Sequence, residues 1–211
     1  MTLYDFPLPF QTSWLNKAII KNTKKTPYTS DIVKKNVISS LNVTPILRIS
    51  KFLKKTSTNA LTCVFSDSTH QILVLLPFKP TIVAFENLYK QRITFHTVNC
   101  LVEIKQANLR FISRQTLAND FEININNKVD IIILEVLDLR IFQRDQVFLS
   151  GHVENRLKFV YFDPKYVEVC GNFDKNEGSR KREKRIEGTR RRRGIRREEK
   201  ASTARVPKEN A

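Results

Sequence analysis

The chain has 211 residues and carries 37 lysines and arginines against 21 aspartates and glutamates, which gives a formal net charge of +16. A strongly basic balance favours an anionic partner, either nucleic acid or a membrane surface. No apolar run reaches the roughly 18–20 residues that span a bilayer, and the first residues, MTLYDFPLPF, lack the basic-then-apolar order of a signal peptide. We therefore expect a soluble intracellular protein without a membrane partner.

Residues that often carry catalysis or bind metals are few and scattered. The three cysteines, Cys63, Cys100 and Cys170, are far apart and odd in number, which indicates reduced thiols. The three histidines share no metal-ligand spacing with each other or with the cysteines. None of the 5 glycines belongs to a phosphate-binding motif. We therefore expect that the protein is not an enzyme and has no catalytic residue, metal or cofactor.

The chain opens with a short amphipathic segment. Thr12 or Ser13 can cap a helix whose apolar face includes Trp14, Leu15, Ala18 and Ile19. Trp14, the only tryptophan, either anchors this helix on the rest of the fold or is an exposed partner contact, because tryptophan is enriched in interface hot spots. Residues 21–40 are polar and basic with weak periodicity, which predicts a loop that contains a short helix.

An alternating pattern begins at residue 44. The side chains of Ile46, Arg48, Ser50 and Phe52 occupy every second position, which predicts a first strand with one wet face. Lys51 lies in this strand. It is either a solvated lysine that discourages mispairing of a strand edge, or a basic contact for a partner.

Two strands and a helix are expected next. The apolar runs Leu61–Phe65 and Ile72–Leu76 flank a polar turn at residues 67–70, a pattern typical of adjacent antiparallel strands. Prolines at positions 77 and 80 then end the second strand, because proline cannot donate to the ladder. The spacing of Ile82, Phe85 and Tyr89 predicts a helix, with Glu86 on its polar side.

Three further apolar runs complete the pattern. We expect a strand pair, Cys100–Ile104 and Leu109–Ile112, joined by the polar link Lys105–Asn108, and a closing strand at Val129–Leu137. The order strand, strand, helix, strand, strand predicts a mostly-β protein, a small Greek-key barrel of the oligonucleotide-binding (OB) type with short flanking helices. The barrel should span residues 44–173, with the helix and basic loop of residues 1–43 packed on it.

The C-terminal part contains two segments of different character. Residues 157–169 are apolar and aromatic, so Phe159, Tyr161, Phe162 and Tyr166 should pack on the barrel, although such side chains can also stack on bases. Residues 174–211 hold 15 basic and 7 acidic residues and few large apolar ones, which predicts a disordered tail. Its longest basic run is either a solvated extension or import signal, or a non-specific nucleic-acid contact: Arg190, Arg191, Arg192 and Arg193.

Several short segments resemble, in the same order, the third ever-shorter-telomeres subunit of yeast telomerase. They are Ser13-Trp14-Leu15, Ser50-Lys51-Phe52, Asp67-Ser68-Thr69-His70-Gln71-Ile72-Leu73-Val74, Arg92-Ile93-Thr94, Thr97-Val98-Asn99-Cys100-Leu101, and Ile141-Phe142 with Asp145-Gln146-Val147. The resemblance implies an OB-fold, similar to that of the animal shelterin subunit that recruits telomerase.

The resemblance also implies roles for particular residues. A pair matching Asp67 and Arg92 forms an ion pair that braces the barrel in the family. From sequence alone Asp67 is a turn residue and Arg92 ends a helix, where cations are favoured. Thr97 and Asn99 alternate with Val98 and Cys100, which indicates solvated polar side chains. The family's telomerase-interacting surface matches five residues: Lys51, Glu86, Thr97, Asn99 and Asp145. The family has two threonines before the asparagine, where this chain has Thr97-Val98.

The implied function is that of a non-enzymatic accessory subunit of telomerase, in the nucleus at chromosome ends, that docks on the catalytic subunit and another accessory protein. The alternative is an independent binder of single-stranded DNA or RNA. That alternative needs exposed aromatic side chains on the barrel face, whereas Phe65, Phe85, Phe111 and Phe142 occupy apolar positions that predict burial. Contact with telomerase RNA or single-stranded telomeric DNA, and self-association, stay open.

Overall fold

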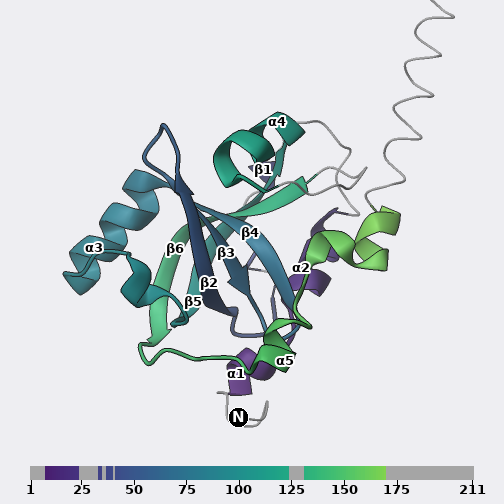
Figure 1. The fold of residues 1–211 in the computed structure, drawn as a ribbon, viewed down its shortest axis with the longest axis horizontal. Helices are drawn as coiled ribbons and strands as arrows, with labels where there is room; N and C mark the ends of the chain where they lie inside the picture. Colours follow the sequence, from purple (N-terminus) through teal and green to yellow (C-terminus); the bar gives the residue numbers. More distant parts are fainter. Residues whose placement is uncertain (1–7, 24–32, 35–36, 40, 124–130, 170–211) are drawn as a thin grey trace, which may run out of the picture. The chain divides into compact units, whose positions relative to one another are not determined.

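Five strands wrap into a closed barrel in the computed structural model (Figure 1). The structure describes residues 8–23, 33–34, 37–39, 41–123 and 131–169, all within a unit of residues 1–171. The strands pair in the order β5-β2-β3-β4-β6, and β5 also pairs with β6, which closes the barrel. This Greek-key order confirms the predicted OB-type barrel. The strands are β2 (Ile46–Lys55), β3 (Leu61–Ser66), β4 (His70–Leu76), β5 (Leu101–Ile112) and β6 (Ile131–Gln143).

The longest ladder joins β5 and β6, antiparallel from Leu101 opposite Gln143 to Ile112 opposite Ile131. The prediction of two strands joined by a link at Lys105–Asn108 is therefore wrong, because β5 is continuous. Shifts in register around Gln106 let Lys105 and Gln106 point to solvent. Asn108 is buried, and its Nδ2 donates to Glu135 Oε2 at 3.0 Å. A polar stretch inside a long ladder thus resembles a turn in the sequence.

The seam between β4 and β6 closes in a different way. These strands are parallel and pair only at Val74 with Leu134 and Leu75 with Glu135. Beyond that short ladder, the Tyr161 hydroxyl accepts from Leu73 N at 3.2 Å and donates to Ile132 O at 2.8 Å. Ile132 N donates to the Tyr166 hydroxyl at 3.3 Å. Two tyrosine hydroxyls therefore satisfy backbone groups that a longer ladder would have paired.

These tyrosines belong to a C-terminal segment that packs on the barrel, as predicted, although the predicted packing of Phe162 is wrong because its side chain is exposed. It consists of β7 (Lys158–Phe159), which pairs with β4, then the 3₁₀ turn η5 (Val160–Phe162) and a helical stretch at residues 164–169. Tyr161 and Tyr166 are fully buried. Burial raises the pKa of Tyr161 well above its usual value, so its hydroxyl stays protonated and able to donate.

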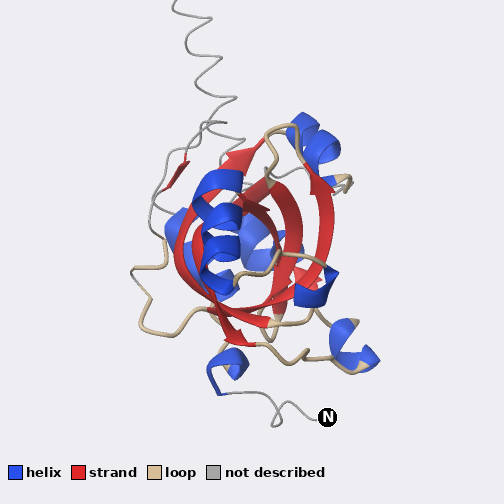
Figure 2. Ribbon diagram, turned by 90° about the vertical axis from the view of Figure 1, so that its left-hand side faces the viewer, coloured by secondary structure: helices blue, strands red, loops and turns tan. Residues whose placement is uncertain are grey.

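A helix lies across one end of the barrel, in front of the strands in Figure 2. It begins as the π-helical turn η2 (Phe78–Val83) and continues as α3 (Ala84–Tyr89), in agreement with the predicted helix. Ile82 and Phe85 are buried in the barrel core. The Thr81 hydroxyl donates to Val136 O at 2.6 Å, which ties the helix to β6.

The N-terminal helix α2 (Leu15–Thr23) packs on the barrel through Leu15, Ala18 and Ile19, which belong to the main core. Trp14 precedes it and is only 3% exposed, and its Nε1 donates to Ile46 O at 3.2 Å. Trp14 is thus an anchor, as the first of its two predicted roles required. The alternative, an exposed partner contact, is wrong in this structure.

Smaller elements complete the described residues. Phe10 of α1 (Leu8–Gln11) packs with Ile46, Leu101 and Val147 in a second apolar cluster. Cys63 and Cys100 are free, buried thiols, while Cys170 and the arginines at 190–193 lie outside the described residues. No described helix is both long and apolar enough to cross a membrane. The other elements are β1 (Val33–Lys34), the 3₁₀ turn η3 (Phe95–Thr97), α4 (Arg114–Thr116), the π-helical η4 (Leu117–Phe121) and α5 (Gly151–Glu154).

Candidate functional site

Three segments that are far apart in the sequence are hydrogen-bonded side by side at one end of the barrel. Asn99 N donates to Ile49 O of β2 at 2.7 Å, and Val147 N, beyond the end of β6, donates to Asn99 O at 2.8 Å. Gln146 Nε2 adds a bond to Val98 O at 3.0 Å. We call this arrangement of Ile49, Asn99 and Val147 the junction. It brings together the segments that carry Lys51, Thr97, Asn99 and Asp145.

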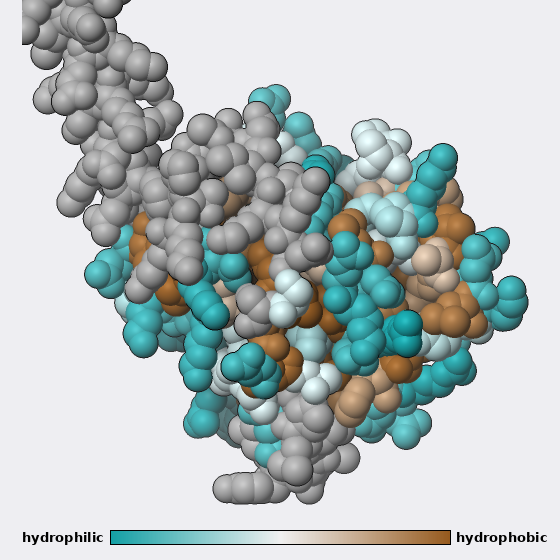
Figure 3. Space-filling model, turned by 180° about the vertical axis from the view of Figure 1, so that it is seen from behind, coloured by the Kyte–Doolittle hydropathy of each residue, from teal (hydrophilic) through white to brown (hydrophobic). Residues whose placement is uncertain are grey.

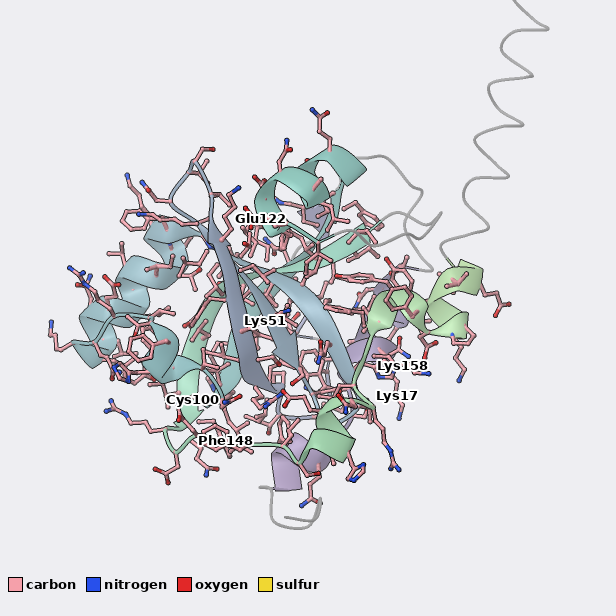
Figure 4. The ribbon with its side chains drawn as sticks, in the orientation of Figure 1. Lys17, Lys51, Cys100, Glu122, Phe148 and Lys158 are labelled. Carbon is pink, nitrogen blue, oxygen red and sulfur yellow. The ribbon has the colours of Figure 1, made fainter. Side chains whose placement is uncertain are left out.

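The helix that carries Glu86 reaches the same region. The Tyr89 hydroxyl at the end of α3 accepts from Ile141 N of β6 at 2.9 Å. The Arg144 guanidinium lies over the Tyr89 ring, 5.8 Å from its centroid. Cys100 Sγ donates to Arg144 O at 3.0 Å, so residue 144 links α3 to the junction. Figure 4 shows Cys100 and Phe148 near each other at the end of the barrel below Lys51.

Buried Arg48 supports the junction from inside. It is 1% exposed, so the wet face predicted for β2 does not include Arg48. Its Nη1 donates to Asn99 Oδ1 at 2.9 Å and its Nη2 to Glu154 Oε1 of α5 at 3.0 Å. Its Nε lies 3.5 Å from Ser66 Oγ. Sequence reasoning missed this residue, although apolar Ile46 on the same face of the strand was a signal that the face is covered.

The backbone around Asn99 is not the alternating strand that the sequence suggested. Thr97 ends the turn η3, and its buried hydroxyl donates to Thr94 O at 2.6 Å. Asn99 adopts φ of 66°, a left-handed conformation that asparagine tolerates better than most residues. Arg48 holds the Asn99 side chain, which is half-buried. The side chains of Thr97 and Asn99 therefore form hydrogen bonds within the protein, whereas the sequence predicted that both would be solvated.

The remaining predicted contact residues are more accessible. Lys51 and Asp145 are exposed, and Glu86 is half-buried on α3. Burial raises the pKa of the Cys100 thiol, Arg144 lowers it and Asp145 raises it. Asp145 therefore lies close enough to the junction to act on it electrostatically. The junction thus joins the segments that carry Lys51, Asn99 and Asp145, and Tyr89 ties the helix that carries Glu86 to β6. Trp14 lies in the core.

The predicted Asp67–Arg92 ion pair does not form between these two described residues. Asp67 is fully buried, and its Oδ2 accepts from Trp14 N at 3.1 Å and Leu15 N at 3.0 Å. Its Oδ1 accepts from Thr69 N and His70 N, both at 2.8 Å. Arg92 is exposed. Asp67 is satisfied by backbone amides at the start of α2 and within its own turn, so it needs no cation.

Exposed apolar side chains lie beside these polar residues, and sequence reasoning did not single them out. Phe95 of η3 is 72% exposed, with its ring centroid 3.9 Å from that of His96. Leu88 of α3 and Phe148 are also exposed, and Figure 3 shows apolar side chains gathered where η2 and α3 lie. Phe142, predicted to be buried with Phe65, Phe85 and Phe111, is 43% exposed because β6 extends past the core there.

The face that OB-folds use for oligonucleotides has a different character. It is formed by the second and third strands, here β3 and β4, and by the loops that follow the first and fourth strands. Among the described residues of that face and those loops, no large apolar side chain is exposed; Phe65 and Phe121 are buried. No cluster of three or more His, Cys, Asp or Glu able to hold a metal occurs among the described residues either.

The closed barrel with its capping helix defines a small OB-fold protein. Residues 11–158 match the family of the shelterin complex subunit TPP1/ACD. The chain is 46% identical over 169 residues to telomere replication protein EST3 of Debaryomyces hansenii, covering 79% of this chain and 84% of that protein. It is 39% identical over 169 residues to EST3 of Candida albicans, covering 79% and 80%.

A solved structure, described as the Est3 telomerase subunit in the yeast Hansenula polymorpha, has the same fold. Its TM-score is 0.54 at 20% identity, and the match covers 75% of this chain and 83% of that one. The chain belongs to the EST3 family of telomere replication proteins, within the TPP1/ACD group. The family resemblance inferred from the short segments is confirmed.

Proposed function

We propose that this protein is a non-catalytic accessory subunit of telomerase that acts in the nucleus at chromosome ends. The observation that carries the proposal is the 46% identity, over 79% of the chain, to a telomere replication protein. The match of residues 11–158 to the family of a shelterin complex subunit supports it. The partners are the telomerase catalytic subunit and another accessory protein.

Docking takes place through a face made of Lys51, Glu86, Phe95, Asn99 and Asp145, which we call the docking face. Its polar members come from β2, α3, the 98–100 turn and the segment after β6, which the junction and Tyr89 join together. Charged groups around an interface fix the orientation of a partner. Phe95, at 72% exposure, offers the apolar anchor that an interface centre usually needs. Thr97 contributes indirectly, because its inward hydroxyl holds the turn that presents Phe95.

The test compares variants of the docking face with a matched control in cells. Phe95→Ala, Glu86→Ala and Asp145→Lys change side chains with no buried partner, so each should shift the free energy of unfolding by less than about 0.5 kcal/mol. Each should nevertheless reduce co-purification with the catalytic subunit and shorten telomeres. Glu122→Lys makes the same charge change as Asp145→Lys on an exposed residue at the end of the barrel opposite Cys100 and Phe148 (Figure 4), and it should leave both readouts unchanged.

Two outcomes would contradict the proposal. If folded docking-face variants gave normal telomere length and normal co-purification, the assignment of this face to docking would be wrong. A loss of single-stranded DNA affinity in proportion to the cellular defect would replace docking with the alternative, an independent nucleic-acid binder that works through this face.

A further inference from the structure

A second surface, on a different set of elements, is formed by α2 and the C-terminal segment. Asn16 Nδ2 of α2 donates to Asp163 Oδ2 at 2.8 Å, and His70 Nε2 lies 3.4 Å from the same oxygen. His70 also pairs with Lys158 of β7. These contacts join α2 to the residue after η5 and β4 to β7, and Figure 4 labels Lys17 on α2 and Lys158 on β7. We call it the basic C-terminal surface: Lys17, Arg156, Lys158, Phe162 and Lys165.

On this surface the cations face solvent, whereas two nearby carboxylates are bonded within the protein. Lys17, Arg156, Lys158 and Lys165 are all exposed, and none forms an ion pair with another described residue. Two neighbouring carboxylates are instead engaged within the protein. Glu154 binds buried Arg48 at 3.0 Å. Asp163 accepts from Asn16 Nδ2 through Oδ2 and from Lys165 N at 2.8 Å through Oδ1. Glu168 is the exposed carboxylate on the 164–169 helix.

This arrangement produces a positive field toward solvent. A carboxylate that is hydrogen-bonded inside the protein screens a neighbouring exposed cation less than one that pairs with it directly. Exposed lysine and arginine side chains without an internal partner are free to bind an external anion. The structure therefore leaves four cations available on adjoining segments.

An exposed aromatic side chain lies between two of these cations in the sequence. In η5, Val160 and Tyr161 are fully buried, whereas Phe162 is 52% exposed. A single exposed aromatic side chain is common on protein surfaces and indicates nothing by itself. Its position between Lys158 and Lys165 matters, because single-stranded nucleic acids bind surfaces that combine cations for the phosphates with an aromatic ring for a base.

We infer that the basic C-terminal surface binds single-stranded nucleic acid, with Lys17, Lys158 and Lys165 contacting phosphates and Phe162 stacking on a base. This site is separate in sequence and in its contacts from the docking face. It also differs from the β3–β4 face on which OB-folds usually bind oligonucleotides. The chain continues beyond residue 169 into the sequence with 15 basic residues from position 174 onward, which favours the same kind of partner.

The experiment measures binding of the full-length chain to a fluorescein-labelled, unstructured single-stranded RNA, and to DNA of the same sequence, as a function of salt. The test variant combines Lys17→Gln, Lys158→Gln and Lys165→Gln. The matched control combines Lys55→Gln, Lys79→Gln and Lys90→Gln, which removes the same charge from exposed lysines of β2, η2 and the end of α3. Melting temperatures of all variants check that the fold is intact.

The test variant should lower the slope of log affinity against log salt by about 2, because each phosphate contact on a single strand contributes about 0.7. The control variant should keep the wild-type slope. Phe162→Ala should weaken binding about fivefold at constant slope, the lower end of what base–aromatic stacking contributes. Since purified chain and nucleic acid are the only components, the result is independent of telomerase docking.

Three results would overturn the inference. An unchanged slope in the test variant would show that the three substituted lysines do not contact phosphates. An equal loss in the test and control variants would mean that binding depends only on net charge. Competition by poly-glutamate as effective as by nucleic acid of equal charge, together with an unchanged affinity of Phe162→Ala, would identify an acidic peptide as the occupant.

Discussion

Asp67 and Arg48, which are the most deeply buried charges among the described residues, are stabilised in opposite ways. Asp67 accepts from four backbone amides, those of Trp14, Leu15, Thr69 and His70, and from the Thr69 hydroxyl. Arg48 donates to side chains, those of Asn99, Glu154 and Ser66. The anion is thus surrounded by dipoles that the backbone fixes, and the cation by groups that depend on the identity of other residues.

The difference separates the roles of the two ends of the chain. Asp67 holds the start of α2 through the backbone amides of Trp14 and Leu15, so this contact requires no particular side chain of the helix. Arg48 holds both the junction and α5, so its effect reaches the docking face through Asn99. A change at Asp67 should affect stability alone, whereas a change at Arg48 should affect stability and docking together.

The largest expected effect is that of Asp67→Ala. It leaves the buried amides of Trp14 and Leu15 without an acceptor and removes the cap of α2, so we expect a loss of about 4 kcal/mol in the free energy of unfolding. Urea denaturation measures it. Asp67→Asn keeps one oxygen acceptor and should lose about half as much. Equal stability of wild type and Asp67→Ala would mean that α2 is not held by this carboxylate.

Arg48→Met should cost about 2 kcal/mol. Methionine fills much of the same space, and the Glu154 carboxylate that is left behind is 51% exposed and can be solvated, which keeps the cost below that of a fully buried broken pair. Unlike Asp67→Asn, this variant should also reduce co-purification with telomerase, because Asn99 loses its donor. Glu154→Gln retains an acceptor for Arg48 and serves as the control, with a cost below about 1 kcal/mol. Normal co-purification of a folded Arg48→Met protein would disconnect Arg48 from docking.

Tyr161 adds a buried neutral group to the comparison. Tyr161→Phe leaves Leu73 N and Ile132 O without their partner, so we expect a loss of about 1.5 kcal/mol near neutral pH. Burial raises the folded pKa of Tyr161 above the unfolded value of about 10. Above that pH unfolding releases a proton, and the free energy of unfolding falls as the pH rises. The advantage of wild type over Tyr161→Phe should therefore shrink by about 1.4 kcal/mol per pH unit above about pH 10. A constant difference in urea denaturation across that range would contradict the assignment.

Arg92→Ala should have the smallest effect. Arg92 is exposed and is not an Asp67 partner, so its removal should change the free energy of unfolding by less than about 0.5 kcal/mol. A loss comparable to that of Asp67→Ala, with partial recovery in the charge-swapped double variant, would restore the ion pair that the family resemblance implied. The thermal melts of the two single variants are enough to decide.

Local patterns predicted the barrel well because its strands and helix have short-range signals. The apolar runs on either side of the 67–70 turn form β3 and β4. The segment in which Ile82, Phe85 and Tyr89 have helical spacing forms η2 and α3. The polar middle of β5 was misread as a link, because the register shifts that expose Lys105 and Gln106 arise from pairing with β6. Such pairing is a property of two strands, and neither strand alone shows it.

The site could be predicted only in outline. The resemblance pointed to Lys51, Glu86, Asn99 and Asp145, and the junction brings their segments together. The partners of Asp67 could not be predicted, because they are backbone amides and the sequence does not show which amides lie close to a carboxylate. The burial of Arg48 was not predicted, since alternation shows which residues share a face but not what covers it. Whether Phe95 would be exposed depended on the turn that follows α3, which has no periodic pattern.

The bonds of Tyr161 and Tyr166 to β4 and β6 have a consequence for the newly made protein. Synthesis proceeds from the N-terminus, so all five barrel strands leave the ribosome before Tyr161 and Tyr166. Until those residues arrive, Leu73 N and Ile132 N and O have no partners, and β4 and β6 present open edges that can pair with another chain. A message with a premature stop between codons 144 and 160 would encode every barrel strand yet yield a product prone to aggregate. The last short segment of the fold thus decides whether the nascent barrel closes on itself.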